Sequence, residues 1–481
     1  MNNDFDIEGT DTVCAVSTPP GRGGIAVVRI SGPRAIEALS SIWKGKPLQH
    51  VQSHTAHLGQ LLDGSQILDQ AIATVFRAPR SYTGDDTVEL SIHGSPYVQR
   101  RVIQLLTANP LSCRLAEPGE FTRRAFKSGH LDLAQAEAVA DVIASTTRTS
   151  HALAIRQLRG SVSDKIRHMR ESLVELASLL ELELDFSEED VEFASRPQLM
   201  ELCDRIEQML ARLSSSFSTG RAIVDGIAVV IVGIPNAGKS TLLNEILDDN
   251  RAIVSDIPGT TRDIIEDTIE LDGILFRFID TAGLRTETTD EIELNGIERA
   301  RQRFASTHIA LFVVDSTSAL DPQLEILADL ISTLPQSATL IPILNKTDIQ
   351  GGITIDDLST KLQTVVENNG TSVIMETPLV HASNNPSLLT DITLKLSSVA
   401  RRILDSGSET DAILTNERHF RSIEQTREAL VETRNKLAEG ISADLVAQHL
   451  RAAISSLSSI TGDIATPEIL TTIFSRFCIG K

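Results

Sequence analysis

The chain has 481 residues, of which 41% are hydrophobic and 23% are charged, which is enough for about three domains. With 44 basic and 65 acidic residues its net charge is −21, which excludes a protein that coats nucleic acid with a uniformly basic surface. The four cysteines form no CxxC pair, and the start MNNDFDIEGTD lacks the features of a signal peptide. We therefore expect a reduced, cytoplasmic protein with no membrane span.

Residues 1–128 have the pattern of an α+β domain. Short apolar runs at 12–18, 24–30, 71–78 and 87–94 are separated by Pro- and Gly-rich stretches, as strands and loops would be. From 129 to 221 the pattern becomes helical. Apolar residues spaced three or four apart from Leu158 to Leu180 predict one amphipathic helix.

In residues 222–402 apolar runs alternate with helical segments, which indicates a parallel or mixed sheet with helices on both faces. Residues 403–481 are helical again, with an apolar stripe from Val446 to Ile460. Two helical blocks on either side of an α/β block predict an insertion. The expected fold is thus a multidomain α/β protein, with an N-terminal α+β domain and a discontinuous helical domain that carries an inserted domain.

The strongest motif lies at the start of this inserted domain. The apolar strand 227–232 runs into GIPNAGKS (233–240) and then into a helix, as a P-loop requires. Its backbone N–H groups would hold phosphates, Lys239 would neutralise the β- and γ-phosphates, and Ser240 would bind Mg²⁺. The nucleotide contacts expected here are Asn236, Ala237, Gly238, Lys239, Ser240 and Thr241.

Two further motifs follow in the order of a Ras-like GTPase domain. GTTRD (259–263) offers Thr261 as a second Mg²⁺ ligand that senses the γ-phosphate. FIDTAG (278–283) predicts a strand that ends at Asp280, with Gly283 placed to contact the γ-phosphate. From these two segments, and from SDIP (255–258) directly before the first, we expect nucleotide contacts by Ser255, Asp256, Ile257, Pro258, Gly259, Thr260, Thr261, Asp280, Thr281, Ala282 and Gly283.

The base specificity comes from NKTD (345–348), which follows another apolar strand. Asp348 can accept hydrogen bonds from N1–H and the N2 amine of guanine, a pair of donors that adenine lacks. Lys346 would pack over the base, and Asn345 would support the loop and N7. HASN (381–384) resembles the usual fifth loop only in part, and there we expect Ala382 to contact the base. The sequence therefore predicts GTP rather than ATP.

Two details bear on hydrolysis. Leu284 follows DTAG where Ras-like enzymes have a glutamine that orients water, so either hydrolysis is slow or another group orients the water, and acidic residues follow at 287–293. Asn236 lies inside the P-loop, where its amide oxygen can help to bind a monovalent cation beside the phosphates. The alternative is that Asn236 only forms the turn.

Beyond the nucleotide motifs, the chain resembles the MnmE (TrmE) family of tRNA modification GTPases over nearly its whole length. The matching stretches are DTVCAVSTPPGRGGIAVVRISGP (11–33), SYTGDDTVELSIHG (81–94), EPGEFTRRAF (117–126), LDLAQAEAVADVI (131–143) and SSITGDIATPEILTTIFSRFCIGK (458–481). The resemblance implies that 222–402 is a TrmE-type G domain between helical parts 129–221 and 403–481. It also implies that 1–128 binds 5-formyl- or methylene-tetrahydrofolate and forms a homodimer.

The resemblance further implies a partner and a reaction. With the FAD-containing protein MnmG (GidA), in a heterotetramer or larger assembly, such proteins place a carboxymethylaminomethyl-type group on C5 of the wobble uridine, position 34 of certain tRNAs. The family is stimulated by K⁺, which here would be held by Asn236, Ser255, Ile257 and Thr260. Its catalytic residues would be Lys239, Gly283 and Glu293, the last orienting water, with Glu291 and Asp290 open because this segment looks one residue longer.

By the same resemblance, the folate contacts would be Arg29 with a folate carboxylate, Glu89 with the pterin, His130 and Lys481. His130 stands where the family has a lysine, so the charge of that contact differs. Cys478 in the terminal FCIGK is either a buried structural thiol or a functional thiol near the folate.

Two other functions fit the nucleotide motifs. One is a switch GTPase in ribosome assembly or translation, against which the folate-domain motifs and FCIGK argue. The other is a scaffold that binds GTP without hydrolysing it.

Overall fold

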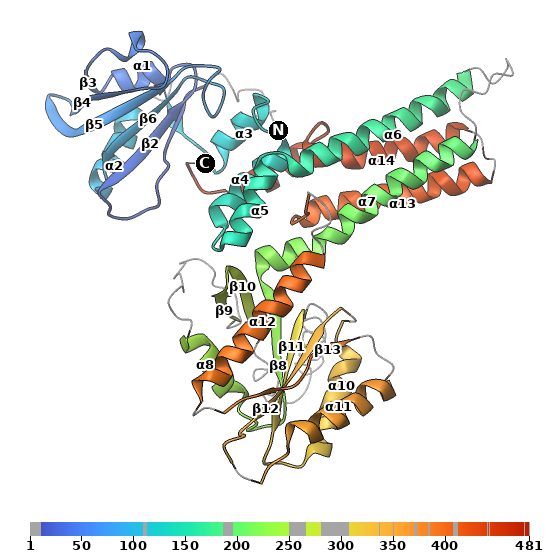
Figure 1. Ribbon diagram of the computed structural model, residues 1–481. Helices are drawn as coiled ribbons and strands as arrows, with labels where there is room; N and C mark the ends of the chain where they lie inside the picture. The colour runs from blue at the N-terminus through green and yellow to red at the C-terminus, as the bar shows by residue number, and fades with distance from the viewer. Residues whose placement is uncertain are drawn as a thin grey trace, which may run out of the picture. The chain divides into compact units, whose positions relative to one another are not determined.

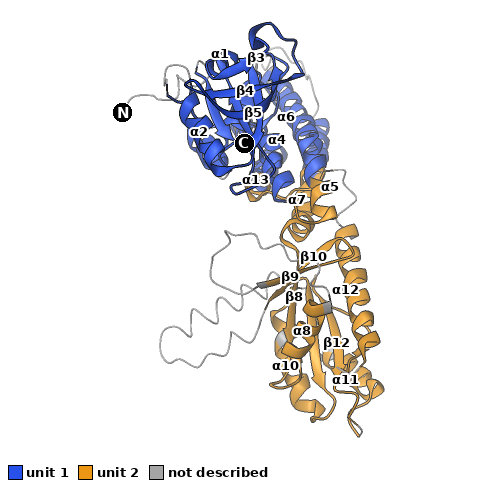
Figure 2. Cartoon of the chain, turned by 90° about the vertical axis from the view of Figure 1, so that its left-hand side faces the viewer, with its two compact units in different colours: residues 1–144, 154–207, 422–481 blue, residues 145–153, 208–421 orange. Residues whose placement is uncertain are grey.

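A computed structural model describes residues 11–480 except 109–112, 186–195, 250–265, 280–306, 336, 350, 370–372, 383–384, 407–411, 440, 442 and 476. The chain divides into two compact units (Figure 2), one of residues 1–144, 154–207 and 422–481 and one of residues 145–153 and 208–421. The domain boundaries after residues 128, 221 and 402 stay predictions. Among the described helices, none has an apolar stretch that could cross a bilayer.

The N-terminal part of the first unit is built on a seven-stranded sheet of order β3-β4-β5-β6-β2-β1-β7. The runs predicted as strands form β1, β2, β5 and β6, and alternate residues of β2 such as Val28 and Ile30 face the core. Helices α1 (Ala35–Ser40) and α2 (Pro96–Leu106) pack against the same core. The strands are β1 (Val13–Val16), β2 (Ile25–Ser31), β3 (Trp43–Gly45), β4 (Thr55–Asp63), β5 (Gln66–Phe76), β6 (Thr87–His93) and β7 (Arg114–Leu115).

Long helices that precede and follow the inserted domain in the sequence pack together in the first unit (Figure 1). Helix α6 (Ser161–Asp185) lies along α14 (Ala443–Thr461), where Arg170 Nε donates to Ser458 Oγ at 2.9 Å. Helix α13 (Glu417–Ala438) joins α7 (Arg196–Asp225) through Arg427 and Glu207, 3.0 Å apart. Segments before and after the inserted domain therefore form one helical domain, as predicted.

One helix prediction is wrong. Leu158 ends α5 (Arg148–Leu158), and a new helix, α6, begins at Ser161. Gly160 between them has φ +94°, a left-handed conformation that ends a helix. The stripe of apolar residues runs across the break, so spacing alone did not reveal it. Shorter helices complete this region, namely α3 (Glu120–Lys127), α4 (Leu133–Ala144) and α15 (Pro467–Phe474).

The second unit contains a sheet of order β13-β12-β11-β8-β10-β9, with β14 also pairing with β12. All its pairs are parallel except β9 with β10, which explains why the apolar runs of the central strands are nearly continuous. The strands are β8 (Ile227–Val232), β9 (Glu266–Leu271), β10 (Ile274–Ile279), β11 (Ile309–Asp315), β12 (Thr339–Asn345), β13 (Ile374–Met375) and β14 (Leu379–Val380).

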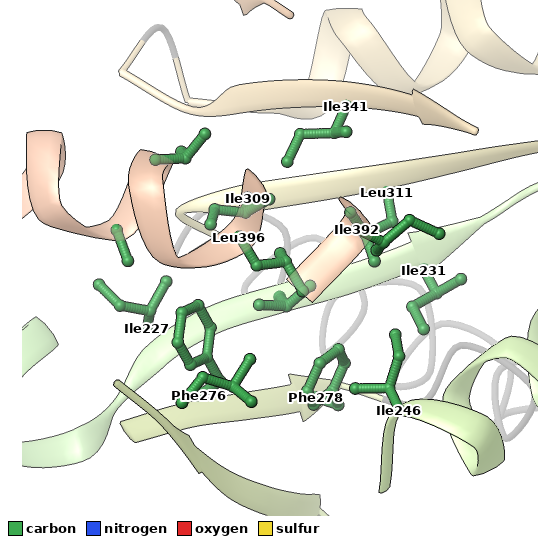
Figure 3. Close-up of a cluster of buried hydrophobic side chains, with 14 of the residues drawn as sticks. Ile227, Ile231, Ile246, Phe276, Phe278, Ile309, Leu311, Ile341, Ile392 and Leu396 are labelled. Carbon is green, nitrogen blue, oxygen red and sulfur yellow. The ribbon is translucent and has the colours of Figure 1, made fainter. Parts of the chain in front are cut away.

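Helices cover both faces of this sheet. On one face, side chains such as Ile227, Leu311 and Phe278 pack against α8 (Lys239–Asp249) and α12 (Pro386–Ser406), as Figure 3 shows. On the other face, the intervening residues, such as Phe312, pack against α10 (Leu320–Thr333) and α11 (Ile355–Asn369). The predicted fold class is confirmed, and the carboxyl ends of β8 and β12 meet at one edge, where ligands of such sheets bind.

Candidate nucleotide-binding and folate-binding sites

The loop between β8 and α8 has the backbone of a P-loop. Asn236 and Gly238 have φ values of +63° and +94°. A Cβ atom on Gly238 would lie 2.2 Å from Nδ2 of Asn345, so no larger residue fits there. The sequence therefore needs glycine at this position both for its conformation and for the close approach of NKTD (345–348), the predicted base-binding segment.

Lys239 is the first residue of α8, and its ammonium group lies over the loop. Nζ donates to the carbonyl oxygens of Gly233 at 3.0 Å and Ile234 at 2.8 Å. Ser240 and Thr241 follow in the first turn and are exposed. A helix N-terminus beside a lysine is a favourable place for phosphate, because the N–H groups and the ammonium all attract anions.

The base-binding segment begins where β12 ends. Asn345 Nδ2 donates to the carbonyl oxygen of Ala237 at 2.7 Å, which connects this segment directly to the P-loop. Lys346 has φ +62°, and its Nζ lies 2.7 Å from Oδ2 of Asp315, at the end of β11. Asp348 is exposed two residues further on.

Asp315 was missed by sequence reasoning. Its burial alone would raise its pKa, but hydrogen bonds from Lys346 and Thr317 hold that pKa below the usual value. The carboxylate thus stays ionised and holds the aliphatic part of Lys346 in the position from which it would pack over a base. Only the pairing of β11 with β12 brings the two residues together.

The fifth loop follows β14. Thr347 Oγ1 donates to the carbonyl oxygen of His381 at 3.1 Å, which places Ala382, a buried residue, next to the NKTD segment. The remaining expected nucleotide, Mg²⁺, K⁺ and water contacts lie outside the described residues: Ser255, Asp256, Ile257, Pro258, Gly259, Thr260, Thr261, Asp280, Thr281, Ala282, Gly283, Asp290, Glu291 and Glu293.

In the N-terminal domain, Arg29 and Glu89 lie directly opposite each other on β2 and β6. Arg29 donates to Glu89 Oε1 from Nη2 at 2.8 Å and from Nε at 3.1 Å. Its guanidinium also lies 5.2 Å from the ring centre of Tyr82 and 5.4 Å from that of Phe121. The structure therefore joins the two predicted folate contacts in one ion pair set against aromatic rings.

Tyr82, which contacts Arg29 of this ion pair, lies in the same hollow as His130. Both side chains line an open hollow of about 460 Å³. Burial raises the pKa of Tyr82, whose hydroxyl forms a 3.0 Å hydrogen bond with Thr122 Oγ1. The hollow is lined by His54, Phe76, Pro79, Arg80, Ser81, Tyr82 and His130.

The C-terminal segment lies beside the same sheet. A Cβ atom on Gly480 would lie 2.4 Å from the carbonyl oxygen of Val16, at the end of β1, and Ser17 Oγ donates to the Gly480 carbonyl at 3.0 Å. Cys478 is exposed, so its interpretation as a buried structural thiol is wrong. Lys481 lies outside the described residues.

The sheet, the P-loop and the base-binding segment together define a P-loop nucleotide-binding protein with the NKTD sequence of guanine-specific members. A family model described as MnmE helical domain matches residues 133–478, and one described as GTP-binding protein TrmE N-terminus matches residues 12–130. The chain belongs to the MnmE family.

Curated relatives agree with this assignment. The chain is 44% identical to the tRNA modification GTPase MnmE of Cytophaga hutchinsonii, over 98% of each chain. It is 43% identical to that of Bacteroides fragilis strain ATCC 25285, and 42% identical to that of Flavobacterium johnsoniae, over 98% of this chain and 99% of each relative.

Proposed function

We propose that this protein is a K⁺-stimulated, Mg²⁺-dependent GTPase that acts in the cytoplasm to modify tRNA. With an FAD-containing MnmG-type partner, it would help to install the carboxymethylaminomethyl-type group on C5 of the wobble uridine. The observation that carries this proposal is the similarity over 98% of the chain to proteins named tRNA modification GTPase MnmE. The hydrogen bond from Asn345 to Ala237, which connects the NKTD segment to the P-loop, supports the proposed binding of GTP.

The residues of the P-loop fit the proposed metal ions. Ser240 is exposed at the start of α8, where its hydroxyl can bind Mg²⁺ together with Thr261. Asn236 is exposed in the loop and offers an amide oxygen, a ligand suited to K⁺. The other proposed K⁺ ligands are Ser255, Ile257 and Thr260. These cations would neutralise charge that develops on the phosphates during hydrolysis. Gly283 would contact the γ-phosphate and Glu293 would orient water, with Glu291 and Asp290 as alternatives.

For the one-carbon donor we propose the Arg29–Glu89 pair, His130 and Lys481. The arginine and the glutamate offer a donor and an acceptor side by side, as a pterin ring with both kinds of group requires. Gly480 lies against Val16, whose neighbour Ala15 pairs with Arg29 across β1 and β2, which supports a role for the C-terminal lysine. The exposed Cys478 is then a candidate functional thiol.

The proposed homodimer is supported by apolar residues on the N-terminal sheet. Leu58 on β4 and Ile72 on β5 lie directly opposite each other and are 73% and 44% exposed. Ile67 at the start of β5 is 57% exposed. Such residues, clustered on one sheet, are typical of a surface that a second copy covers.

Phosphate release separates this proposal from a scaffold that only binds GTP. The purified protein should release phosphate from GTP in Mg²⁺ and K⁺, and it should do so much more slowly from ATP. Absence of release in the presence of tight GTP binding would favour the scaffold.

Replacing Arg29 with glutamine tests the folate site. We expect affinity for 5-formyl-tetrahydrofolate to fall about tenfold or more, because a partly buried charge-assisted hydrogen bond is lost and Glu89 is left without its partner. Equilibrium dialysis measures this. Arg100→Gln, at an exposed position on α2, is the matched control and should bind like the unmodified protein. Equal folate affinity of Arg29→Gln and the control would contradict the assignment.

A further inference from the structure

A buried imidazole contacts the base-binding segment. His381, directly after β14, is 1% exposed. Its Nδ1 lies 2.7 Å from Oδ1 of Asn345, and its Nε2 lies 2.8 Å from Oε2 of Glu245. Glu245 belongs to α8, the helix that begins with Lys239. The imidazole therefore joins the base-binding segment to the helix at whose start phosphates would bind.

The neighbours of Asn345 determine where the hydrogens lie. Its amide nitrogen donates to Ala237 O at 2.7 Å, and its amide oxygen accepts from Lys346 N at 2.8 Å. The atom that faces His381 is thus an acceptor, so Nδ1 of the imidazole must donate. The atom that faces Nε2 is a carboxylate oxygen, also an acceptor, so Nε2 donates as well. The imidazole is thus held at both nitrogens, by the Asn345 amide oxygen on one side and by the Glu245 carboxylate on the other.

We propose that His381, oriented by Glu245, is a positioning residue that holds the Asn345 amide against the P-loop and so sets the affinity for guanine nucleotides. The space around Asn345 is tight, since a methyl-sized group on Gly238 would collide with its Nδ2. Without the donor at residue 381, one of three hydrogen bonds that fix this amide is lost. The inference rests on the proposed role of Asn345 in guanine binding.

Two substitutions of similar size separate positioning from simple filling of space. In His381→Asn the amide nitrogen takes the place of Nδ1 and can still donate to Asn345. In His381→Gln the amide nitrogen takes the place of Nε2, reaches toward Glu245 and leaves Asn345 without its donor. If His381 only filled space in the core, the two substitutions would change the nucleotide affinity to the same extent.

The experiment is equilibrium titration of the full chain and its variants with fluorescent GDP. We expect His381→Gln to raise the Kd about tenfold and His381→Asn to raise it less than about threefold. Glu245→Ala should weaken binding several-fold in the unmodified chain and much less in the His381→Gln background, because the two residues act through one contact.

Thermal unfolding without nucleotide is the second readout. Equal GDP affinities for His381→Asn and His381→Gln, whether both weak or both unchanged, would overturn the inference, even if their melting temperatures differ. Failure of the unmodified chain to bind GDP would instead contradict the proposed function itself, so the two failures are distinguishable.

Discussion

Replacing Asp348 with asparagine should exchange the preference for GTP for a preference for XTP. The asparagine amide can donate to the C2 carbonyl of xanthine, whereas toward guanine it would set a donor against the N2 amine. A site built to bond a polar group rejects the mismatched analogue strongly, so we expect GTP affinity to fall by about 100-fold or more. Competition of both nucleotides against fluorescent GDP measures this.

The matched control is Asp356→Asn, which changes the charge equally at an exposed position on α11 of the same unit. It should leave the preference for GTP unchanged. If Asp348→Asn still prefers GTP to XTP, the assignment of NKTD to guanine reading is wrong.

GTP hydrolysis should be much faster in K⁺ than in Na⁺, and loss of the Asn236 amide should remove most of this difference. Removal of one well-placed electrostatic group from an active site typically lowers kcat by ~10²–10³-fold. Asn236 has φ +63°, so Asn236→Ala would add backbone strain of ~1 kcal/mol to the loss of the ligand.

Asn236→Gly separates the two effects, because glycine adopts this conformation without strain. In each variant, the rate of GTP hydrolysis in K⁺ should be as low as the rate in Na⁺. Equal rates of the unmodified protein in K⁺ and Na⁺ would mean that Asn236 serves only as a turn residue.

Local patterns were enough to predict much of the fold. The strand at 227–232 coincides with β8, because a central parallel strand is apolar throughout and a P-loop must follow it. The break at Gly160 was not predicted, since the apolar spacing continues across it. A glycine inside a helical pattern can be tolerated or can end the helix, and the spacing does not distinguish these.

Contacts between segments that are far apart in the sequence could not be predicted from local sequence patterns. Nothing in the spacing of Arg29 and Glu89 reveals that they pair, because their contact depends on the register of β2 with β6. The pairing of Lys346 with Asp315 depends on sheet order in the same way. His381 was overlooked because its loop matches the usual motif only in part, and its role emerges from buried hydrogen bonds to β12 and α8.

The most direct test of the account is mass spectrometry of tRNA nucleosides from cells that lack this chain. The account predicts that the C5 aminomethyl-type group of the wobble uridine disappears, that ribosomal subunits stay normal, and that a plasmid copy of the chain restores the modified nucleoside. Unchanged levels of that nucleoside in the deleted cells, with or without a defect in ribosomal subunits, would contradict the account.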